Sequence, residues 1–483
     1  MSAPPTTRGD LRSGSATATL VAAVLGFFVI TLDALVVAVA LPDIRDDLGG
    51  GIAGLQWVID GYTLLFAALL LFAGSLTDRV GARRAFGTGM AVFVAASAAC
   101  GLAPNLAVLI VARQVQGTGA ALMMPSSLTL IRQAYPDPAA RGRAIAWWTI
   151  SGSVAAAAGP VSGGALSLAS WRMIFFINLP VGVVALVLLA RAARSPRRDV
   201  PVDWTGQLAA MVAMGGLTYG MIEAGADGFG PPKTALVVAV VALVVFAVAQ
   251  ARGRHPMVPP ELVRSRTMLI ASGSGFAFLA GLSGTVFVFS LYLQQHRGLS
   301  SLDTGLVFLP MTALSAVLGV PTARLTEKFG PRLPIVGGLF LMGVSLTVLA
   351  TLPASAPVWL LALILIPVGC CGPLAMQPTT AVLLEHVPAH HSGVASGVFN
   401  TSRQLGAALA IAVFGALLAN HTNLLPGLRT SLTIAAALAF AAAAANLRIS
   451  APPRPGEGSR NRDRRCSRSW GTGSASWRRG GGR

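Results

Sequence analysis

Runs of about 20 apolar residues recur along this chain, and they constrain its fold more than any other feature. A helix of that length crosses the hydrocarbon core of a bilayer. Fourteen windows qualify, at residues 17–41, 54–75, 85–103, 105–130, 142–168, 173–191, 205–224, 234–251, 267–293, 302–323, 333–351, 357–383, 392–419 and 430–446. These runs do not alternate as the strands of a membrane barrel do. The sequence therefore predicts an all-α integral membrane protein with 14 spans.

The composition excludes the soluble classes of protein. The 483 residues are 54% hydrophobic and 11% charged, whereas a soluble domain carries about 25% charged residues. A net charge of +18 would indicate nucleic-acid binding in a soluble protein, but membrane proteins carry such charge in their cytoplasmic loops. We therefore expect the lipid bilayer as a partner, no nucleic acid and no enzymatic activity.

The sequence offers few groups for holding a metal, a cofactor or a nucleotide. Its four cysteines, Cys100, Cys370, Cys371 and Cys466, show neither metal-ligand spacing nor a disulfide framework. A phosphate-binding loop of the kind that ATP-driven pumps use is missing from the sequence. We expect no metal and no cofactor, with the proton as the coupling ion.

The positions of Lys and Arg predict the orientation. With the N-terminus in the cytoplasm, the loops that contain Arg79, Arg141, Arg194, Arg264 and Lys328 all lie on the cytoplasmic side. An excess of basic residues in cytoplasmic loops is the rule for membrane proteins. An even number of spans then places both termini in the cytoplasm, and we expect a multi-pass protein of the cytoplasmic (inner) cell membrane.

The chain contains an internal duplication. Residues 76–83 read LTDRVGAR and residues 325–332 read LTEKFGPR, each between the second and third windows of its half. Internal repeats are typical of transporters that rock two bundles about a central site. The predicted units are an N-terminal tail (1–16), a six-helix bundle (17–191), two inserted helices with linkers (192–266), a second six-helix bundle (267–446) and a disordered basic tail (447–483).

Three ionisable side chains inside the N-terminal windows are candidates for proton coupling. Asp33 and Arg113 each lie about 12 Å from the outer end of their window at 1.5 Å per residue, and Asp60 lies about 9 Å deep. Charged groups at such depth are costly and usually functional. We predict that they form a cluster, in which burial favours the protonated carboxyl and the guanidinium favours the carboxylate. Alternatively, Arg113 only binds backbone carbonyls and Asp60 is only hydrated.

A substrate cavity is predicted from Gln116, Met123, Asn400 and Arg403. Methionine suits an adaptable apolar wall, although packing is an equally good interpretation of Met123. Arg403 lies near the middle of its window beside Asn400, and it could bind substrate or coordinate carbonyl groups across the C-terminal bundle. Acidic side chains would suit a cationic substrate and arginines an anionic one, so the charge of the substrate stays open.

Two further groups of residues are candidates for conformational control. The loop at 74–84 combines a carboxylate, a turn glycine and several arginines, which predicts charge contacts that hold the cytoplasmic side closed; plain topology would explain the arginines alone. The fifth window is interrupted by a proline, which kinks helices, and by glycines, which permit close packing. The loop residues are Gly74, Asp78, Arg79, Gly81, Arg83 and Arg84, and the helix residues are Gly159, Pro160, Gly163 and Gly164.

Six motifs resemble those of the major facilitator superfamily. The sequences at 74–84 (GSLTDRVGARR) and 113–121 (RQVQGTGAA) are similar to its loop and fourth-helix signatures, and 159–164 (GPVSGG) resembles the fifth-helix motif of its antiporters. The first-helix segment 32–42, residues 171–182 and residues 400–406 (NTSRQLG) resemble the 14-span drug:proton antiporter family. The resemblance extends from about residue 17 to residue 446. It implies a proton-driven exporter of drugs or antibiotics.

The hypothesis that follows is an antiporter that exports a small hydrophobic compound, with two competing interpretations. The first is a facilitator-type importer of a small nutrient, which predicts a cavity rich in polar side chains. The second is a membrane sensor without transport activity, in which Asp33 carries no function. We expect the chain to function as a monomer, and the sequence leaves the substrate and the coupling stoichiometry open.

Overall fold

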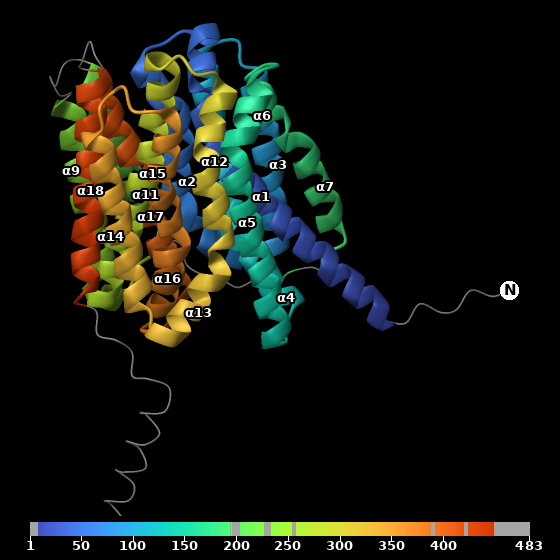
Figure 1. Cartoon of the computed structure of the whole chain (residues 1–483). Coiled ribbons are helices and arrows are strands. Elements are labelled where there is room, and N and C mark those ends of the chain that lie inside the picture. The colour runs from blue at the N-terminus through green and yellow to red at the C-terminus, as the bar shows by residue number, and fades with distance from the viewer. Residues whose placement is uncertain are drawn as a thin grey trace, which may run out of the picture.

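The chain folds into a bundle of long, roughly parallel helices (Figure 1). The computed structural model describes residues 8–193, 195, 203–226, 233–253, 257–387, 392–419 and 424–448. All regular structure within these ranges is helical. The predicted basic tail falls almost entirely outside the described residues.

The first group of helices corresponds to the N-terminal bundle. It consists of α1 (Arg8–Leu48), α2 (Ile52–Val80), α3 (Ala82–Gly101), α4 (Leu106–Ala134), α5 (Pro138–Ser167), α6 (Met173–Phe176) and α7 (Asn178–Ala190). Helix α4 packs against α2 and α3, and α1 packs against α5 and α7. Helix α1 extends beyond the predicted window at both ends, because backbone hydrogen bonding continues past the apolar part of the sequence.

The C-terminal group repeats this arrangement. It consists of α11 (Arg266–Leu291) with a π-helical turn η1 (Tyr292–His296), α12 (Ser301–Val317), α13 (Gly319–Phe329), α14 (Arg332–Thr351), α15 (Val358–Cys371), a second π-helical turn η2 (Gly372–Met376), α16 (Gln377–Glu385), α17 (Ser392–Ala419) and α18 (Leu424–Asn446). The contact of α11 with α17 matches that of α1 with α5, and α12 with α15 matches α2 with α4. The two halves meet along α2 and α17 and along α5 and α12.

The inserted pair occupies one side of this junction. Helices α8 (Trp204–Ala226) and α9 (Lys233–Arg252) pack together, and α8 also packs against α2 and α17, one helix from each half. The short helix α10 (Pro260–Arg264) then leads into α11. Because α8 touches both halves, the insertion is part of the helix packing and not a separate appendage.

Every predicted window is helical, but four are divided between elements: 173–191 between α6 and α7, 267–293 between α11 and η1, 302–323 between α12 and α13, and 357–383 among α15, η2 and α16. The apolar length also varies among the helices. Twelve helices in the described ranges are long and apolar enough to cross a membrane, or up to 13 if the bent pair Ser301–Val317 and Pro321–Phe329 is one span. Helix α8 is not among the 12. Its apolar sequence is interrupted by Gln207, Thr218 and Glu223, and Gln207 and Thr218 are buried against the bundle.

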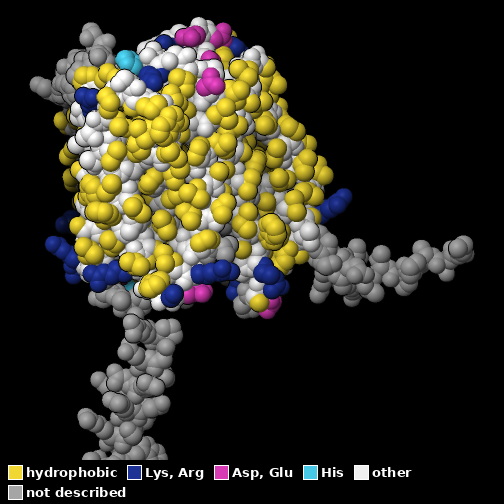
Figure 2. All heavy atoms as spheres, in the orientation of Figure 1, with side chains coloured by type: hydrophobic (Ala, Val, Ile, Leu, Met, Phe, Trp, Pro, Cys, Tyr) yellow, Lys and Arg dark blue, Asp and Glu magenta, His cyan; other side chains and the backbone are white. Residues whose placement is uncertain are grey.

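The surface divides into an apolar belt and two polar ends (Figure 2). Lys and Arg side chains gather at one end of the bundle, which we call the basic end, and acidic side chains gather at the other, which we call the acidic end. Helix α1 runs from the side of the basic end toward the acidic end (Figure 1), so the α1–α2 loop lies at the acidic end and the α2–α3 loop lies at the basic end. The exposed valines of α9, such as Val237, Val241 and Val244, belong to the belt. An apolar band of this kind is the surface that a lipid bilayer covers.

The duplicated loops have the same turn. Gly81, between α2 and α3, has φ +90° and its N–H donates to Thr77 O at 3.0 Å. Gly330, between α13 and α14, has φ +81° and its N–H donates to Thr326 O at 2.9 Å. Side chains disfavour these positive φ values, so the same backbone requirement explains glycine at both positions.

We expect Gly81→Ala to destabilise the protein by about 1–3 kcal/mol, because the β-carbon strains this backbone conformation. Gly74→Ala is the matched control, since Gly74 lies within α2 and a β-carbon there would meet nothing within 4 Å. Thermal unfolding in detergent measures both. Equal melting temperatures for the two variants would contradict the strain argument.

Candidate functional site

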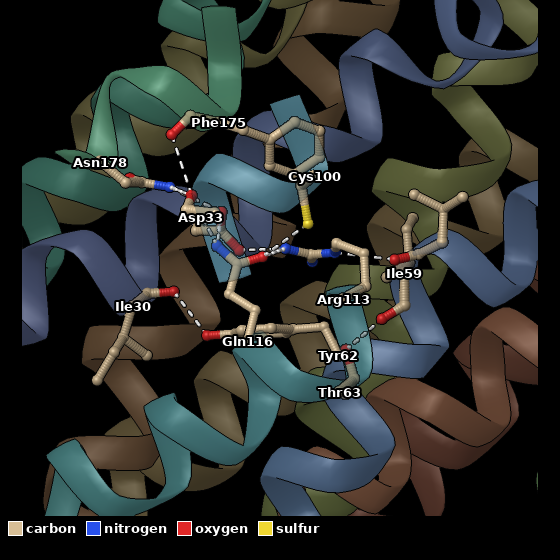
Figure 3. A network of polar contacts seen from close by, with 12 residues as sticks. Ile30, Asp33, Ile59, Tyr62, Thr63, Cys100, Arg113, Gln116, Phe175 and Asn178 are labelled. Atoms are coloured by element: carbon tan, nitrogen blue, oxygen red, sulfur yellow. Dashed lines mark hydrogen bonds and ion pairs between the residues drawn. The ribbon is translucent and has the colours of Figure 1, made fainter. Parts of the chain in front are cut away.

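An ion pair lies in the interior of the N-terminal half. Asp33 on α1 and Arg113 on α4 are both 0% exposed, and Arg113 Nη1 donates to Asp33 Oδ2. Figure 3 shows the two side chains pointing toward each other between the helices. Arg113 Nε donates to Val58 O on α2 at 3.0 Å, and its guanidinium lies 4.4 Å from the ring centre of Tyr62. Both charges are thus compensated by partners within the protein.

Neutral polar groups complete this network (Figure 3). Gln116 Nε2 on α4 and Asn178 Nδ2 on α7 donate to Asp33 Oδ1 at 2.9 and 3.0 Å. Gln116 Oε1 accepts from Arg113 Nη1 at 2.7 Å. Both amide groups also donate to Ser97 Oγ on α3, at 3.1 and 3.0 Å. Five helices therefore contribute to one buried site, in which Asp33 accepts three hydrogen bonds.

The structure brings together two of the three residues predicted to couple protons. Asp33 and Arg113 are in contact, but Asp60 makes no contact with either. Gln116, predicted for the substrate cavity, is 0% exposed and bridges the ion pair instead. The sequence analysis assigned no role to Ser97, and Asn178 entered only through a family motif. The signal for both is a polar residue within an apolar helix.

Asp60 lies at the junction of the two halves. It is 0% exposed, and neither carboxylate oxygen has a hydrogen-bond partner among the described residues. One turn earlier on α2, Gln56 Nε2 donates to Ile411 O and Ala412 O of α17, at 2.9 and 2.7 Å. Because residues four apart share a face of a helix, Asp60 is buried on the side of α2 that packs against α17.

The remaining predicted cavity residues have different surroundings. Met123 is 0% exposed and packs in the core of the N-terminal half with Phe86 and Phe93 in this conformation, so its role in a substrate cavity stays a prediction. Asn400 is partly buried on α17 and donates to Ser396 O at 2.9 Å. Arg403, one turn further along α17, is also partly buried.

The predicted gate residues make no charge contact between helices in this conformation. Asp78, Arg79 and Arg84 are exposed, and the three ion pairs among the described residues do not involve the loop. Arg83 instead binds within its own half, where Nη2 donates to Ala190 O of α7 at 2.8 Å. Gly74 lies within α2 and Gly81 forms the turn. The charge contacts predicted to close this side are therefore not formed here.

The glycines of α5 allow its neighbours to approach closely. A β-carbon on Gly159 would lie 2.9 Å from Leu35 Cβ, and one on Gly163 would lie 2.6 Å from Val36 O, both on α1. One on Gly164 would lie 2.6 Å from Leu302 Cα on α12, in the other half. With Pro160 inside the same helix, these small residues set the spacing at one of the two junctions between halves, as predicted for close helix packing.

Side-chain hydrogen bonds join the halves at the acidic end. Ser301 Oγ of α12 donates to Asp43 Oδ2 of α1 at 2.7 Å. Gln294 Nε2, in the turn after α11, donates to Val39 O at 2.9 Å. Gln56 adds the two bonds to α17 described above. The contacts at this end therefore hold the acidic sides of the two halves together.

Comparison with known sequences gives the family. The sequence model of the Major Facilitator Superfamily matches residues 23–411. The chain belongs to the major facilitator superfamily. As a member of this family of transporters it is a membrane transporter rather than an enzyme, which confirms that prediction. No group of three or more potential metal ligands lies within the part of the chain that the structure describes.

Curated relatives of this transporter are named for drug resistance. The methylenomycin A resistance protein of Bacillus subtilis is 35% identical over 84% of this chain and 88% of its own length. The multidrug resistance protein Stp of Mycobacterium tuberculosis is 36% identical over 83% of this chain and 75% of its own length. The tetracenomycin C resistance and export protein of Streptomyces glaucescens is 35% identical over 84% of this chain and 76% of its own length. The predicted membership in a drug-efflux branch of the superfamily is thus confirmed.

Solved structures of other transporters share the fold of this superfamily member. A peptide transporter POT in complex with sulfate has a TM-score of 0.65 at 16% identity, with 92% of this chain and 98% of that chain covered. A D-xylose–proton symporter has a TM-score of 0.65 at 14% identity, with 90% and 98% covered. At these identities the likeness establishes the helical architecture alone.

We expect Asp33→Asn and Arg113→Gln each to destabilise the transporter by about 3–5 kcal/mol, because each leaves a buried charge without its partner. The double variant should lose clearly less than the sum of the two, since it buries no unpaired charge. Thermal unfolding in detergent completes this double-mutant cycle. Strictly additive losses would show that the pair has no coupling energy.

Proposed function

We propose that this transporter exports hydrophobic drugs or antibiotics across the cytoplasmic membrane in exchange for protons, by alternating access. The observation that carries the proposal is the ion pair of Asp33 and Arg113, buried in a half that packs against its duplicate. The names of three relatives, two of them antibiotic resistance proteins, support the direction and the class of substrate. No covalent chemistry and no cofactor other than the proton is required.

The proton is carried by Asp33 in this proposal. While Arg113, Gln116 and Asn178 surround the carboxylate, binding of a proton is opposed. A movement that draws α1 away from α4 leaves the carboxylate in a poorly solvated place, where the neutral acid is favoured. Because five helices supply the partners, rearrangement of the half changes the proton affinity of Asp33. Asp60, which has no hydrogen bond here, is the second carboxyl group that can hold a proton.

The topology follows from the charge on the two ends. We assign the basic end to the cytoplasm, because basic loops are retained there. Both termini then lie in the cytoplasm, and α8 is the fourteenth span, its polar side chains facing α2 and α17 rather than lipid. The hydrogen bonds at the acidic end correspond to a state closed to the outside. We propose that the chain functions as a monomer.

A proton-coupled exporter should confer resistance that depends on Asp33. In an efflux-deficient bacterium we expect the wild-type chain to protect against methylenomycin A or tetracenomycin C, and a protonophore to remove the protection. Asp33→Asn should lower the inhibitory concentration to that of cells without the protein, because the variant carries no exchangeable proton. Asp303→Asn, at an exposed carboxyl group, is the matched control.

Three outcomes would contradict this proposal in different ways. Resistance that survives the protonophore would remove proton coupling. Drug accumulation raised by the protein would favour an importer. Unchanged sensitivity for the wild type and for Asp33→Asn alike would favour a membrane protein without transport activity.

Alternating access predicts that fixing the acidic end stops transport. In a background without native cysteines, the D43C/S301C variant should form a disulfide, because the side chains of Asp43 and Ser301 are in hydrogen-bond contact. The cross-linked protein should lose export in vesicles, and a reducing agent should restore it. The single variants D43C and S301C are the controls. Full export by the cross-linked protein would show that the acidic end does not open during transport.

A further inference from the structure

Arg403 is a second guanidinium within the helices, and no carboxylate among the described residues forms an ion pair with it. The acidic residues described in α11–α18 are Asp303, Glu327 and Glu385, which lie in the first turn of α12, in the last turn of α13 and at the last residue of α16. None of them reaches the middle of α17, where Arg403 lies.

The hydrogen bonds of Arg403 are also incomplete. Its one hydrogen bond in the described part of the chain joins Nη1 to Asn400 Oδ1 at 3.4 Å, the long limit for such a contact. Nε is buried without a partner. Arg113 also has one buried nitrogen without a partner among the described residues, Nη2, but its Nε binds a backbone carbonyl and its Nη1 binds a carboxylate. The carbonyl coordination considered for Arg403 from sequence is therefore not formed.

The immediate surroundings of Arg403 are aromatic and apolar. Its guanidinium carbon lies 5.9 Å from the ring centre of Phe278 and 5.8 Å from that of Phe399. Such cation–π contacts contribute about 0.5–2 kcal/mol, which is less than the several kcal/mol that burial of an ion costs. Gly275 on α11 leaves room for the stem of the side chain. The site thus combines an uncompensated positive charge with flat apolar walls.

Arg403 lies on a helix that forms the junction of the halves. Two residues earlier, Thr401 Oγ1 donates to Ala67 O of α2 at 3.5 Å. A buried carboxyl group such as Asp60 can become neutral by taking up a proton, but a guanidinium cannot lose its proton in a protein. Because no acidic side chain among the described residues forms an ion pair with Arg403, its charge is available to an anionic group of another molecule.

We propose that Arg403 is a substrate-binding residue and that this transporter takes amphiphilic organic anions, in which a carboxylate or enolate is attached to a flat apolar body. The planar guanidinium presents paired N–H donors that match a carboxylate, and Phe278 and Phe399 contact the apolar part. Asn400 holds Nη1 at the side of the site. This inference rests on the proposed export function, because the bound anion is a substrate only if the protein transports it. The anion site itself rests on the unpaired guanidinium.

Binding of two pyrene compounds, which share a flat apolar body but differ in their head groups, tests the proposal. The probes are 1-pyrenebutyrate, an anion, and 1-pyrenebutanol, its neutral counterpart, titrated by fluorescence into the full-length protein in nanodiscs with empty nanodiscs subtracted. We expect the wild type to bind the butyrate more tightly than the alcohol. R403Q should raise the Kd of the butyrate at least about tenfold, equal to about 1.4 kcal/mol, and R403K should recover part of the loss. R264Q, which removes an exposed arginine, should change neither Kd.

A structural role for Arg403 makes different predictions. An arginine that anchors helices would lower the melting temperature when replaced and would weaken both probes together. The proposal expects R403Q to melt at or above the temperature of the wild type, because it removes an uncompensated buried charge, and to keep its affinity for pyrenebutanol. Equal loss for both probes, unchanged butyrate binding in R403Q, or no butyrate binding by the wild type would overturn the proposal.

The same probes separate this inference from the export function. If the protein exports a cationic or neutral drug in a protonophore-sensitive manner but does not prefer the anion, the proposed function stands and the anion site is wrong. If butyrate binding depends on Arg403 but no compound is exported, the anion site stands and the export function is wrong.

Discussion

A carboxylate and a guanidinium meet inside the N-terminal helices with no accessible surface on either side chain. Removing two such ions from water costs several kcal/mol each, and the cost is offset here by their mutual attraction and by donors from Gln116 and Asn178. The partners come from α1, α2, α3, α4 and α7, so this one contact joins five helices of the half. In the proposed mechanism, a rearrangement of these helices changes whether Asp33 holds a proton.

The two halves share a fold, but they differ in how the arginine within their helices is compensated. In the N-terminal half Arg113 is compensated by Asp33, whereas in the C-terminal half Arg403 has no acidic partner among the described residues. Asp60, without a hydrogen bond, lies on α2 at the junction between them. This asymmetry agrees with the two proposals, in which the N-terminal half exchanges protons and the C-terminal half binds the substrate. The two halves meet at the contacts of α2 with α17 and of α5 with α12.

The sequence predicts most of the fold because the length of each apolar run and the duplicated loop motif can be read from it directly. It also places Asp33 and Arg113 at equal depth, which follows from 1.5 Å per residue. It does not predict the direction in which a side chain points around its helix. Asp60 therefore appeared to belong to the ion pair, although it lies toward α17. Met123, predicted for a cavity wall, is packed in the core in this conformation. The window at 205–224 is predicted as a span, but α8 is not among the helices long and apolar enough to cross a membrane, and its Gln207 and Thr218 are buried in the helix packing.

The central claim is that Asp33 is ionised while the ion pair is intact and takes up a proton when the half rearranges. Infrared spectroscopy of the cross-linked D43C/S301C variant, with the spectrum of the same protein carrying D33N subtracted, tests this most directly. We predict carboxylate bands alone in the cross-linked state, and a carboxylic acid band when the disulfide is reduced at the same pH. A spectrum of Asp33 that is identical in the two states would contradict the account.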